Sequence, residues 1–291
     1  MRVAERVPLL CFVGCFVFAG GNAVGIRFSN RELDPLWGAA VRFGAAAVVL
    51  LAVMAVMRLP LPRGRALAGA ALFGVLNFGV TFGLAYYALQ RIHAGLGQTV
   101  LALVPLVTLL LAAAQGRERL SGRAVLGTLC AAAGVAVVSQ ASLARAVPVL
   151  SLLAILGAVL CFSEAAVLAD RLPPLHPVTT NAVGMTAAAA VLFPASRLAG
   201  DTWALPSRPA TWWAVGYLVL VGSVLTFVLY LLVIKGWGAA RAAYVFVLIP
   251  VVTIVLSAWL DDEPLTTALL LGTPLIIAGV YLGALRRGTP D

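Results

Sequence analysis

The fold is decided by a stretch of 36 residues that the chain contains twice. Residues 100–135 read VLALVPLVTLLLAAAQGRERLSGRAVLGTLCAAAGV, and residues 245–280 read VFVLIPVVTIVLSAWLDDEPLTTALLLGTPLIIAGV. The two stretches align without a gap at an offset of 145, and 15 of the 36 aligned positions are identical. Apolar composition alone gives roughly three or four matches, so the chain contains an internal repeat.

The repeat extends upstream of these stretches. Thr81 matches Thr226 at the same offset, and the offset becomes 142 further upstream. We therefore divide the chain into a first half, residues 1–144, and a second half, residues 145–291.

Both halves are dominated by apolar residues. The chain of 291 residues is 62% hydrophobic and only 11% charged, whereas average soluble domains are about 45–50% apolar and about 25% charged. So few charges cannot cover a soluble domain of this size, which excludes the soluble globular, disordered and collagen-like classes. The composition indicates an integral membrane protein made of apolar helices. A membrane β-barrel is excluded, because its short strands alternate apolar and polar residues.

Charges, prolines and loop signals divide the chain into ten apolar runs, and each run can cross about 30 Å of hydrocarbon as a helix. The runs are 8–26, 35–57, 66–90, 92–116, 124–144, 146–169, 178–196, 210–234, 242–260 and 264–285. We therefore expect an all-α integral membrane protein with ten transmembrane helices, five in each half. Because five is odd, the second half is inverted relative to the first, as in many secondary transporters.

The basic residues orient these helices. The connections on one side, together with both tails, contain 13 Lys and Arg residues, and the connections on the other side contain 6. By the positive-inside rule, both termini of this multi-pass protein of the cell membrane are cytoplasmic. The repeat agrees, because RER at 117–119 becomes DEP at 262–264. The net charge of +9 is explained by topology, and no nucleic-acid partner is expected.

Ten spans in two five-helix halves resemble the drug/metabolite transporter superfamily, EamA type. Each half of that pattern has a proline inside its fourth helix and a glutamate just beyond it, here Pro105 with Glu118 and Pro250 with Glu263. The opening stretch FAGGNA at 18–23 is also similar, although the family usually has a tryptophan before the glycines. The resemblance implies transport of small metabolites, amino acids or drugs through a central cavity between the halves.

Polar residues and prolines inside the spans are the candidates for substrate binding. They are Asn22, Arg42, Asn77, Thr81, Gln98, Pro105, Thr108, Glu164, Thr226, Tyr230, Pro250 and Thr253. Such side chains either bond neighbouring helices or wall a polar cavity. Pro105 and Pro250 each remove the N–H that bonds the carbonyl four residues back, which exposes that carbonyl to a neighbour or a substrate. The alternative is a packing kink in which the threonine three residues on bonds its own backbone.

Two ionisable residues inside the spans each have two interpretations. Arg42 either snorkels to the outer interface and pairs with Asp34, or faces the cavity, where it can meet a carboxylate substrate. Glu164 is the only acidic residue within a span. It is either a site of proton coupling or a solvated carboxylate at a helix end, with Arg171 as a partner.

We therefore expect a secondary transporter, and not an enzyme, that moves a small organic metabolite, amino acid or drug by alternating access. Export is favoured by the resemblance alone, and proton antiport and facilitated diffusion are both open, as are monomer and homodimer. No phosphate-binding GxxxxGK[ST] loop or metal motif is present, so no cofactor is expected. The rival class is a membrane-embedded enzyme acting on a lipid-linked substrate, which needs a cluster of acids or histidines that the sequence lacks. A third reading is a membrane sensor that moves no solute.

Overall fold

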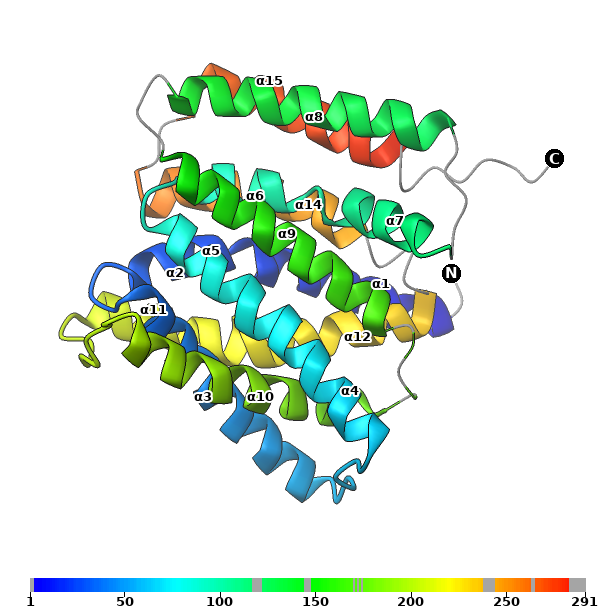
Figure 1. The fold of residues 1–291 in the computed structure, drawn as a ribbon, viewed down its shortest axis with the longest axis vertical. Helices are drawn as coiled ribbons and strands as arrows, with labels where there is room; N and C mark the ends of the chain where they lie inside the picture. The colour runs from blue at the N-terminus through cyan, green and yellow to red at the C-terminus, as the bar shows by residue number, and fades with distance from the viewer. Residues whose placement is uncertain are drawn as a thin grey trace.

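The computed structural model of the chain describes residues 3–116, 122–143, 148–169, 171, 173, 175–237, 244–262 and 265–282. Within these residues every regular element is a helix, as expected. The helices run across the molecule, and the connections gather at its two ends (Figure 1). Glu118 and Glu263, the glutamates of the repeated motif, lie outside the described residues.

Helical structure follows the predicted runs closely. The helices of the first half are α1 (Val3–Gly20), α2 (Asn22–Ser29), α3 (Pro35–Val56), α4 (Arg65–Gly74), α5 (Thr81–Leu89), α6 (Ala94–Leu101), α7 (Val104–Ala114) and α8 (Gly122–Leu143). Those of the second half are α9 (Val149–Ala169), α10 (Pro177–Leu198), α11 (Pro209–Val219), α12 (Thr226–Trp237), α14 (Tyr244–Leu260) and α15 (Thr267–Val280). Two π-helical segments, η1 (Val75–Val80) and η2 (Leu220–Leu225), join α4 to α5 and α11 to α12. In the described part of the chain, seven helices are long and apolar enough to cross a membrane. They coincide with seven of the ten predicted runs, and the other three runs overlap α8, α14 and α15.

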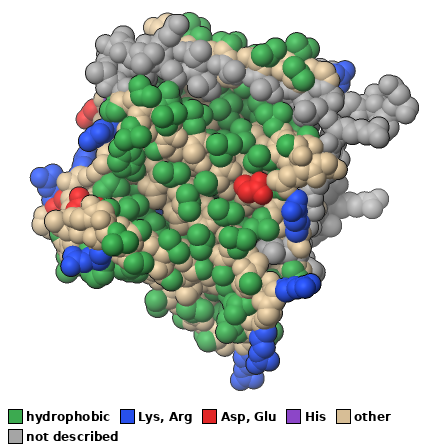
Figure 2. Space-filling view, viewed as in Figure 1, with side chains coloured by type: hydrophobic (Ala, Val, Ile, Leu, Met, Phe, Trp, Pro, Cys, Tyr) green, Lys and Arg blue, Asp and Glu red, His purple; other side chains and the backbone are tan. Residues whose placement is uncertain are grey.

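The exterior of the helices is apolar. Val56, Leu198 and Trp213 are 84%, 89% and 80% exposed. Figure 2 shows apolar side chains over the middle of one face and Lys and Arg side chains towards its edges. So much exposed apolar surface is typical of a protein that contacts lipid.

Close helix contacts depend on glycine. A Cβ placed on Gly74 of α4 would lie 2.1 Å from the Cα atom of Gly184 in α10. A Cβ on Gly279 of α15 would lie 2.5 Å from the backbone nitrogen of Ala131 in α8. The α8–α15 pair forms a separate layer at one side of the molecule (Figure 1). Small residues at these crossings let the backbones touch, as is usual in membrane helix packing.

The two π-helical segments are 145 residues apart and are held in the same way. The Thr81 hydroxyl donates to the carbonyl oxygen of Leu76 at 2.8 Å. The Thr226 hydroxyl donates to the carbonyl oxygen of Val221 at 2.7 Å. A π-turn displaces a carbonyl from its usual N–H partner, so a hydroxyl five residues later can take that place.

The first span is interrupted at its glycines. α1 ends at Gly20 and α2 begins at Asn22, and Gly21 between them has φ −77° and ψ −11°, a tighter right-handed turn than a regular helix. Two carbonyls next to this irregularity accept hydrogen bonds from hydroxyl groups. The hydroxyl of Tyr217 donates to the carbonyl of Phe18 at 2.5 Å. The hydroxyl of Thr253 donates to the carbonyl of Gly20 at 2.7 Å. Side chains from the second half therefore supply the partners that hydrocarbon cannot.

The fourth and ninth spans differ at their prolines. α6 ends at Leu101 and α7 begins at Val104, with Pro105 in its first turn. The matched break at Pro250 is not formed, because α14 continues through that proline. The Thr253 hydroxyl also donates to the carbonyl of Ile249 at 3.1 Å, four residues back along the same helix, a bond that threonines commonly make within helices.

Candidate functional site

A cavity of about 70 Å³ lies where the two interrupted spans meet helices of the second half. Its walls include α1 and α2, which flank the interruption of the first span, and α6 and α7, which flank the interruption of the fourth span. α5, α9, α12 and α14 complete its walls. Broken helices inside a membrane protein are tolerated where they line a cavity, which makes this the candidate site.

Five of the twelve predicted site residues line this cavity together. They are Asn22, Thr81, Gln98, Thr226 and Tyr230. Three come from the first half and two from the second, so the cavity lies between the halves. All five carry uncharged polar groups, which can bind the polar part of a solute by hydrogen bonds.

The rest of the lining is apolar and was not predicted. It consists of Cys15, Ala19, Phe82, Ala85, Leu101, Val104, Phe162, Phe227, Val245, Phe246 and Ile249. Four of these residues are phenylalanines, and rings of this kind provide apolar walls for a ligand. In spans that are apolar throughout, no sequence signal separates a cavity-facing phenylalanine from a lipid-facing one.

Arg42 lies directly behind this lining and is fully buried. Its Nε donates to the Ser223 hydroxyl at 2.8 Å. Its Nη2 donates to the Gly222 carbonyl at 3.0 Å and to Asn22 Oδ1 at 3.2 Å. Its Cζ lies 4.7 Å from the centre of the Phe82 ring. Because Asn22 and Phe82 both line the cavity, the guanidinium is separated from the cavity by one layer of side chains.

The interpretation of Arg42 as a snorkelling residue paired with Asp34 is wrong. Asp34 instead accepts hydrogen bonds from the backbone N–H and the hydroxyl of Thr202. Gly222 leaves room for the Asn22 amide, which accepts a hydrogen bond from the inward-facing Arg42. A Cβ on Gly222 would lie 2.0 Å from Asn22 Oδ1 and 3.4 Å from Arg42 Nη2.

Glu164 lies on α9 outside the cavity lining. Gln115 Nε2 donates to its Oε2 at 2.9 Å, and Arg171 donates to Oε1 of the same Gln115. The expected pairing of Glu164 with Arg171 is therefore made through the amide of Gln115.

The other predicted site residues do not line the cavity. Asn77 is buried within η1, and Pro105 and Pro250 are buried in α7 and α14. Thr108 donates to the Val104 carbonyl at 2.7 Å. Thr108 and Thr253 therefore each bond the carbonyl four residues back. This is the alternative interpretation, in which the threonine bonds its own backbone.

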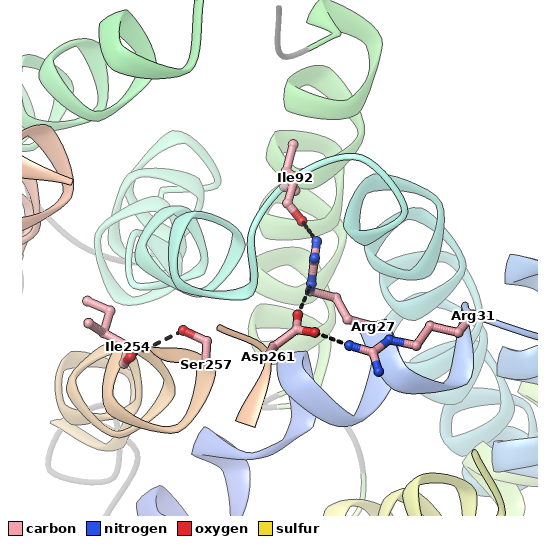
Figure 3. Close-up of polar contacts among 6 residues, drawn as sticks. All are labelled: Arg27, Arg31, Ile92, Ile254, Ser257 and Asp261. Atoms are coloured by element: carbon pink, nitrogen blue, oxygen red, sulfur yellow. Dashed lines mark hydrogen bonds and ion pairs between the residues drawn. The ribbon is translucent and has the colours of Figure 1, made fainter. Parts of the chain in front are cut away.

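An ion-pair cluster joins the two halves at the end of the molecule that contains the 90–93 turn (Figure 3). Arg27 Nε lies 2.6 Å from Asp261 Oδ2, and Arg27 Nη1 donates to the carbonyl of Ile92 at 2.7 Å. Arg31 pairs with the other oxygen of Asp261. The Asp261 side chain is only 3% exposed. Two cations therefore surround one buried carboxylate.

No metal site accompanies the cluster. Within the described residues, no group of three or more acids, cysteines or histidines is placed to hold a metal ion.

Glu32 provides a second set of contacts between the two halves at this end of the molecule. It accepts hydrogen bonds from the hydroxyl and backbone N–H of Ser207 and from the backbone N–H of Arg208 at 3.0 Å. The side-chain hydrogen bonds from Ser207 and Thr211 lower the pKa of Glu32 from 4.5 to about 2. A first-half connection therefore holds the start of α11 in the second half.

Comparison with known proteins agrees with this architecture. The EamA-like transporter family model matches residues 6–140 and again residues 149–284. The chain is 30% identical over 290 residues to the uncharacterized inner membrane transporter YedA of Escherichia coli (strain K12), covering 99% of this chain and 94% of that protein. It is 28% identical over 286 residues to an uncharacterized transporter of Archaeoglobus fulgidus, covering 93% of this chain and 96% of that one. One solved structure has the same fold, with a TM-score of 0.68 at 20% identity over 96% of each chain.

Proposed function

The chain belongs to the EamA-like transporter family, and from this premise we propose that it is a secondary transporter that moves a small organic metabolite, amino acid or drug by alternating access. The observation that carries the proposal is the cavity between two interrupted spans, walled by polar residues from both halves. Discontinuous helices at a midplane site are typical of secondary transporters.

We assign the chain ten transmembrane helices in two inverted halves, residues 1–144 and 145–291. The two separate matches of the family model support this division. The π-helical segments 145 residues apart, each closed by a threonine, support it as well. The basic asymmetry of the connections puts both termini in the cytoplasm. A cysteine placed at Arg63 should then resist impermeant reagents in intact cells, and external labelling would reverse the assignment.

In this orientation the ion-pair cluster of Arg27, Arg31 and Asp261 closes the outer end of the transporter. Opening to the outside then requires Asp261 to separate from both arginines, since the cluster joins α2 and the connection after it to the residue that follows α14. The chain passes between a state closed by this cluster and a state in which the cluster is separated.

Cysteines at Arg27 and Asp261 provide the direct test. In a protein whose four native cysteines are alanine, oxidation of this pair to a disulfide should abolish flux of a metabolite panel in proteoliposomes. Reduction should restore it. The two single-cysteine variants are the controls and should keep the flux of the cysteine-free parent under both conditions. Full flux through the oxidised pair would exclude outer closure at this cluster.

We further propose export as the direction of transport. Proton antiport and facilitated diffusion are the two driving modes, and the pH dependence of flux in a variant of Glu164, the only acidic residue within a predicted span, distinguishes them. Under proton antiport, the variant Glu164→Gln should flatten the pH dependence of flux without loss of folding. A wild-type pH profile in this variant would favour facilitated diffusion.

The rival function is an enzyme acting on a lipid-linked substrate. It predicts that the protein chemically alters its substrate, and mass spectrometry of the solute recovered after the flux assay distinguishes the two functions.

A further inference from the structure

We propose that the cavity selects small organic anions, and that Arg42 sets this preference through the cavity wall without touching the substrate. The inference rests on the proposed transport function, because it concerns the charge of the solute that the same cavity admits. It names a substrate class, amphipathic monoanions such as carboxylates with an apolar body. It also names a specificity-determining residue outside the lining.

The first observation is that the charge of Arg42 is not neutralised. Arginine keeps its proton in proteins. All three hydrogen bonds of its guanidinium go to uncharged groups, on Ser223, Gly222 and Asn22. None of the acidic residues in the described part of the chain pairs with it. A lone buried cation is costly inside a membrane, so such residues usually mark a functional site.

The second observation is that the hydrogen bonding of the guanidinium is incomplete. Nη1 of Arg42 is buried and has no hydrogen-bond partner. A purely structural arginine in the interior of a protein normally has its donors satisfied. The Tyr86 hydroxyl interacts with the guanidinium but also has no hydrogen-bond partner within bonding distance. Because a tyrosine hydroxyl is uncharged, the folded chain leaves the positive charge of Arg42 unneutralised.

The third observation is the composition of the lining. Among the described residues that line the cavity, none carries a formal charge. The guanidinium stands immediately behind Asn22 and Phe82 and is the nearest charge identified at this wall. The electrostatic potential inside the cavity is therefore positive, because the described lining contains no acidic residue that would offset the charge of Arg42.

The size of the effect follows from Coulomb's law. At roughly 8 Å and an effective dielectric constant of about 20, a unit negative charge gains about 30-fold in affinity over a neutral analogue, and a cation loses a similar factor. Binding an anion also removes the cost of the uncompensated buried cation. The apolar rings around the lining accommodate the body of the solute.

The charge of the cavity can be measured without knowing the substrate. Ala19 lines the cavity one turn before Asn22, so we place a single cysteine there, in a protein whose native cysteines are alanine. The probes are the anionic sulfonatoethyl and the cationic trimethylammonioethyl methanethiosulfonates. Each rate is divided by the rate of the same reagent with 2-mercaptoethanol. We expect the normalised ratio to favour the anionic reagent by at least about tenfold.

Arg42 variants identify the source of the preference. Arg42→Gln should bring the ratio close to one, and Arg42→Lys should keep the anion preference. The ratio in the protein that retains Arg42 decides the question even where Arg42→Gln fails to fold. A ratio of one or below in that protein overturns the inference.

Binding provides the second measurement. Calorimetry of the purified protein with butyrate, butyramide and butylammonium compares three solutes of similar shape and different charge. Butyrate should bind at least about tenfold more tightly than butyramide, and butylammonium most weakly. Preference for butylammonium, with flux intact, would overturn the charge inference and leave the transporter proposal standing. A cavity cysteine that reacts with neither reagent would instead count against the transport function, because the cavity would then never open to water.

Discussion

The spans Arg65–Leu89 and Pro209–Val233 share a backbone and differ in what surrounds it. Each contains a six-residue π-helical segment closed by a threonine hydroxyl. At η2 the neighbour is Arg42, whose guanidinium bonds Gly222. Near η1 the residue aligned with Arg42 at the offset of 142 is Gly184, which packs against the backbone of Gly74.

This difference shows that a repeated backbone can be used once for packing and once for polarity. A π-segment widens the helix and displaces carbonyls, which is a common feature of functional sites. Near η1 the neighbouring glycines bring α4 and α10 into backbone contact. Beside η2 the same space holds a cation and an amide that reaches the cavity. Substrate recognition is therefore expected to be asymmetric even where the fold is repeated.

Gly74→Ala should have the largest effect, because it tests packing near η1. The added Cβ would lie 2.1 Å from both Cα and O of Gly184, and backbone atoms of two helices cannot move apart cheaply. We expect a loss of about 3 kcal/mol of stability, at the upper end for overpacking. The measurement is the melting temperature in detergent. Gly216→Ala is the control, because nothing lies within 4 Å of its added Cβ. Equal melting temperatures for the two variants would contradict the close contact.

Gly222→Ala should cost less stability and more function. Its Cβ would meet Asn22 Oδ1 at 2.0 Å, and that atom ends a side chain that can rotate away. We expect a loss of about 1–2 kcal/mol, together with a large fall in flux, because Asn22 would be displaced from both Arg42 and the cavity. Melting temperature and proteoliposome flux are measured on the same preparation. If Gly222→Ala kept full flux, the polar surroundings of η2 would have no role in transport.

The sequence predicted the seven spans that are long enough to cross a membrane in the described residues. It singled out the five polar residues that line the cavity together with seven residues that do not line it. It did not predict the irregularities of the helices. Asn22, Gln98 and Thr226 stand out because a polar residue in an apolar run needs a partner. The π-segments have no such signal, because one displaced hydrogen bond barely alters an apolar pattern. The partners of Arg42 could not be predicted either. Gly222 is one of them through its backbone carbonyl, and its lack of a side chain makes room for Asn22. Pro105 and Pro250 look identical in sequence, yet only the first stands at a helix break.

Removing the threonine hydroxyls should have similar effects on the two spans, because the two hydroxyls bond the backbone in the same way. Thr81→Val and Thr226→Val each delete one hydroxyl bond to a displaced carbonyl and keep the shape of the side chain. Hydrogen bonds between helical residues in membranes are worth about 0.6–2 kcal/mol, so each variant should lose about 1 kcal/mol. Thr81 lies also 3.4 Å from the Ala158 carbonyl, so its loss should be slightly the larger. A double variant that loses the sum of the two would show that the segments are independent. No loss in either variant would mean that water replaces the hydroxyls.

The smallest effect concerns how the two spans begin. Arg65–Leu89 starts after Gly64, whose positive φ of 58° makes an open turn with no contact at its Cβ position. Pro209–Val233 starts beside Arg208, whose N–H donates to Glu32.

The pKa of Glu32 is lowered to about 2 in the folded chain, and an unfolded glutamate has a pKa of about 4.3. The attachment therefore contributes fully above that unfolded value and is lost as the pH falls from about 4.3 towards 2. Hydrogen exchange at the amides of Ser207 and Arg208, corrected for intrinsic rates, should show protection that declines across this range. In Glu32→Gln, protection should be low and independent of pH, and amides in the middle of α12 should show no change in either protein. Unchanged protection of Ser207 and Arg208 down to pH 2 would mean that ionised Glu32 does not hold these amides. The starts of the two spans would then no longer differ in this respect.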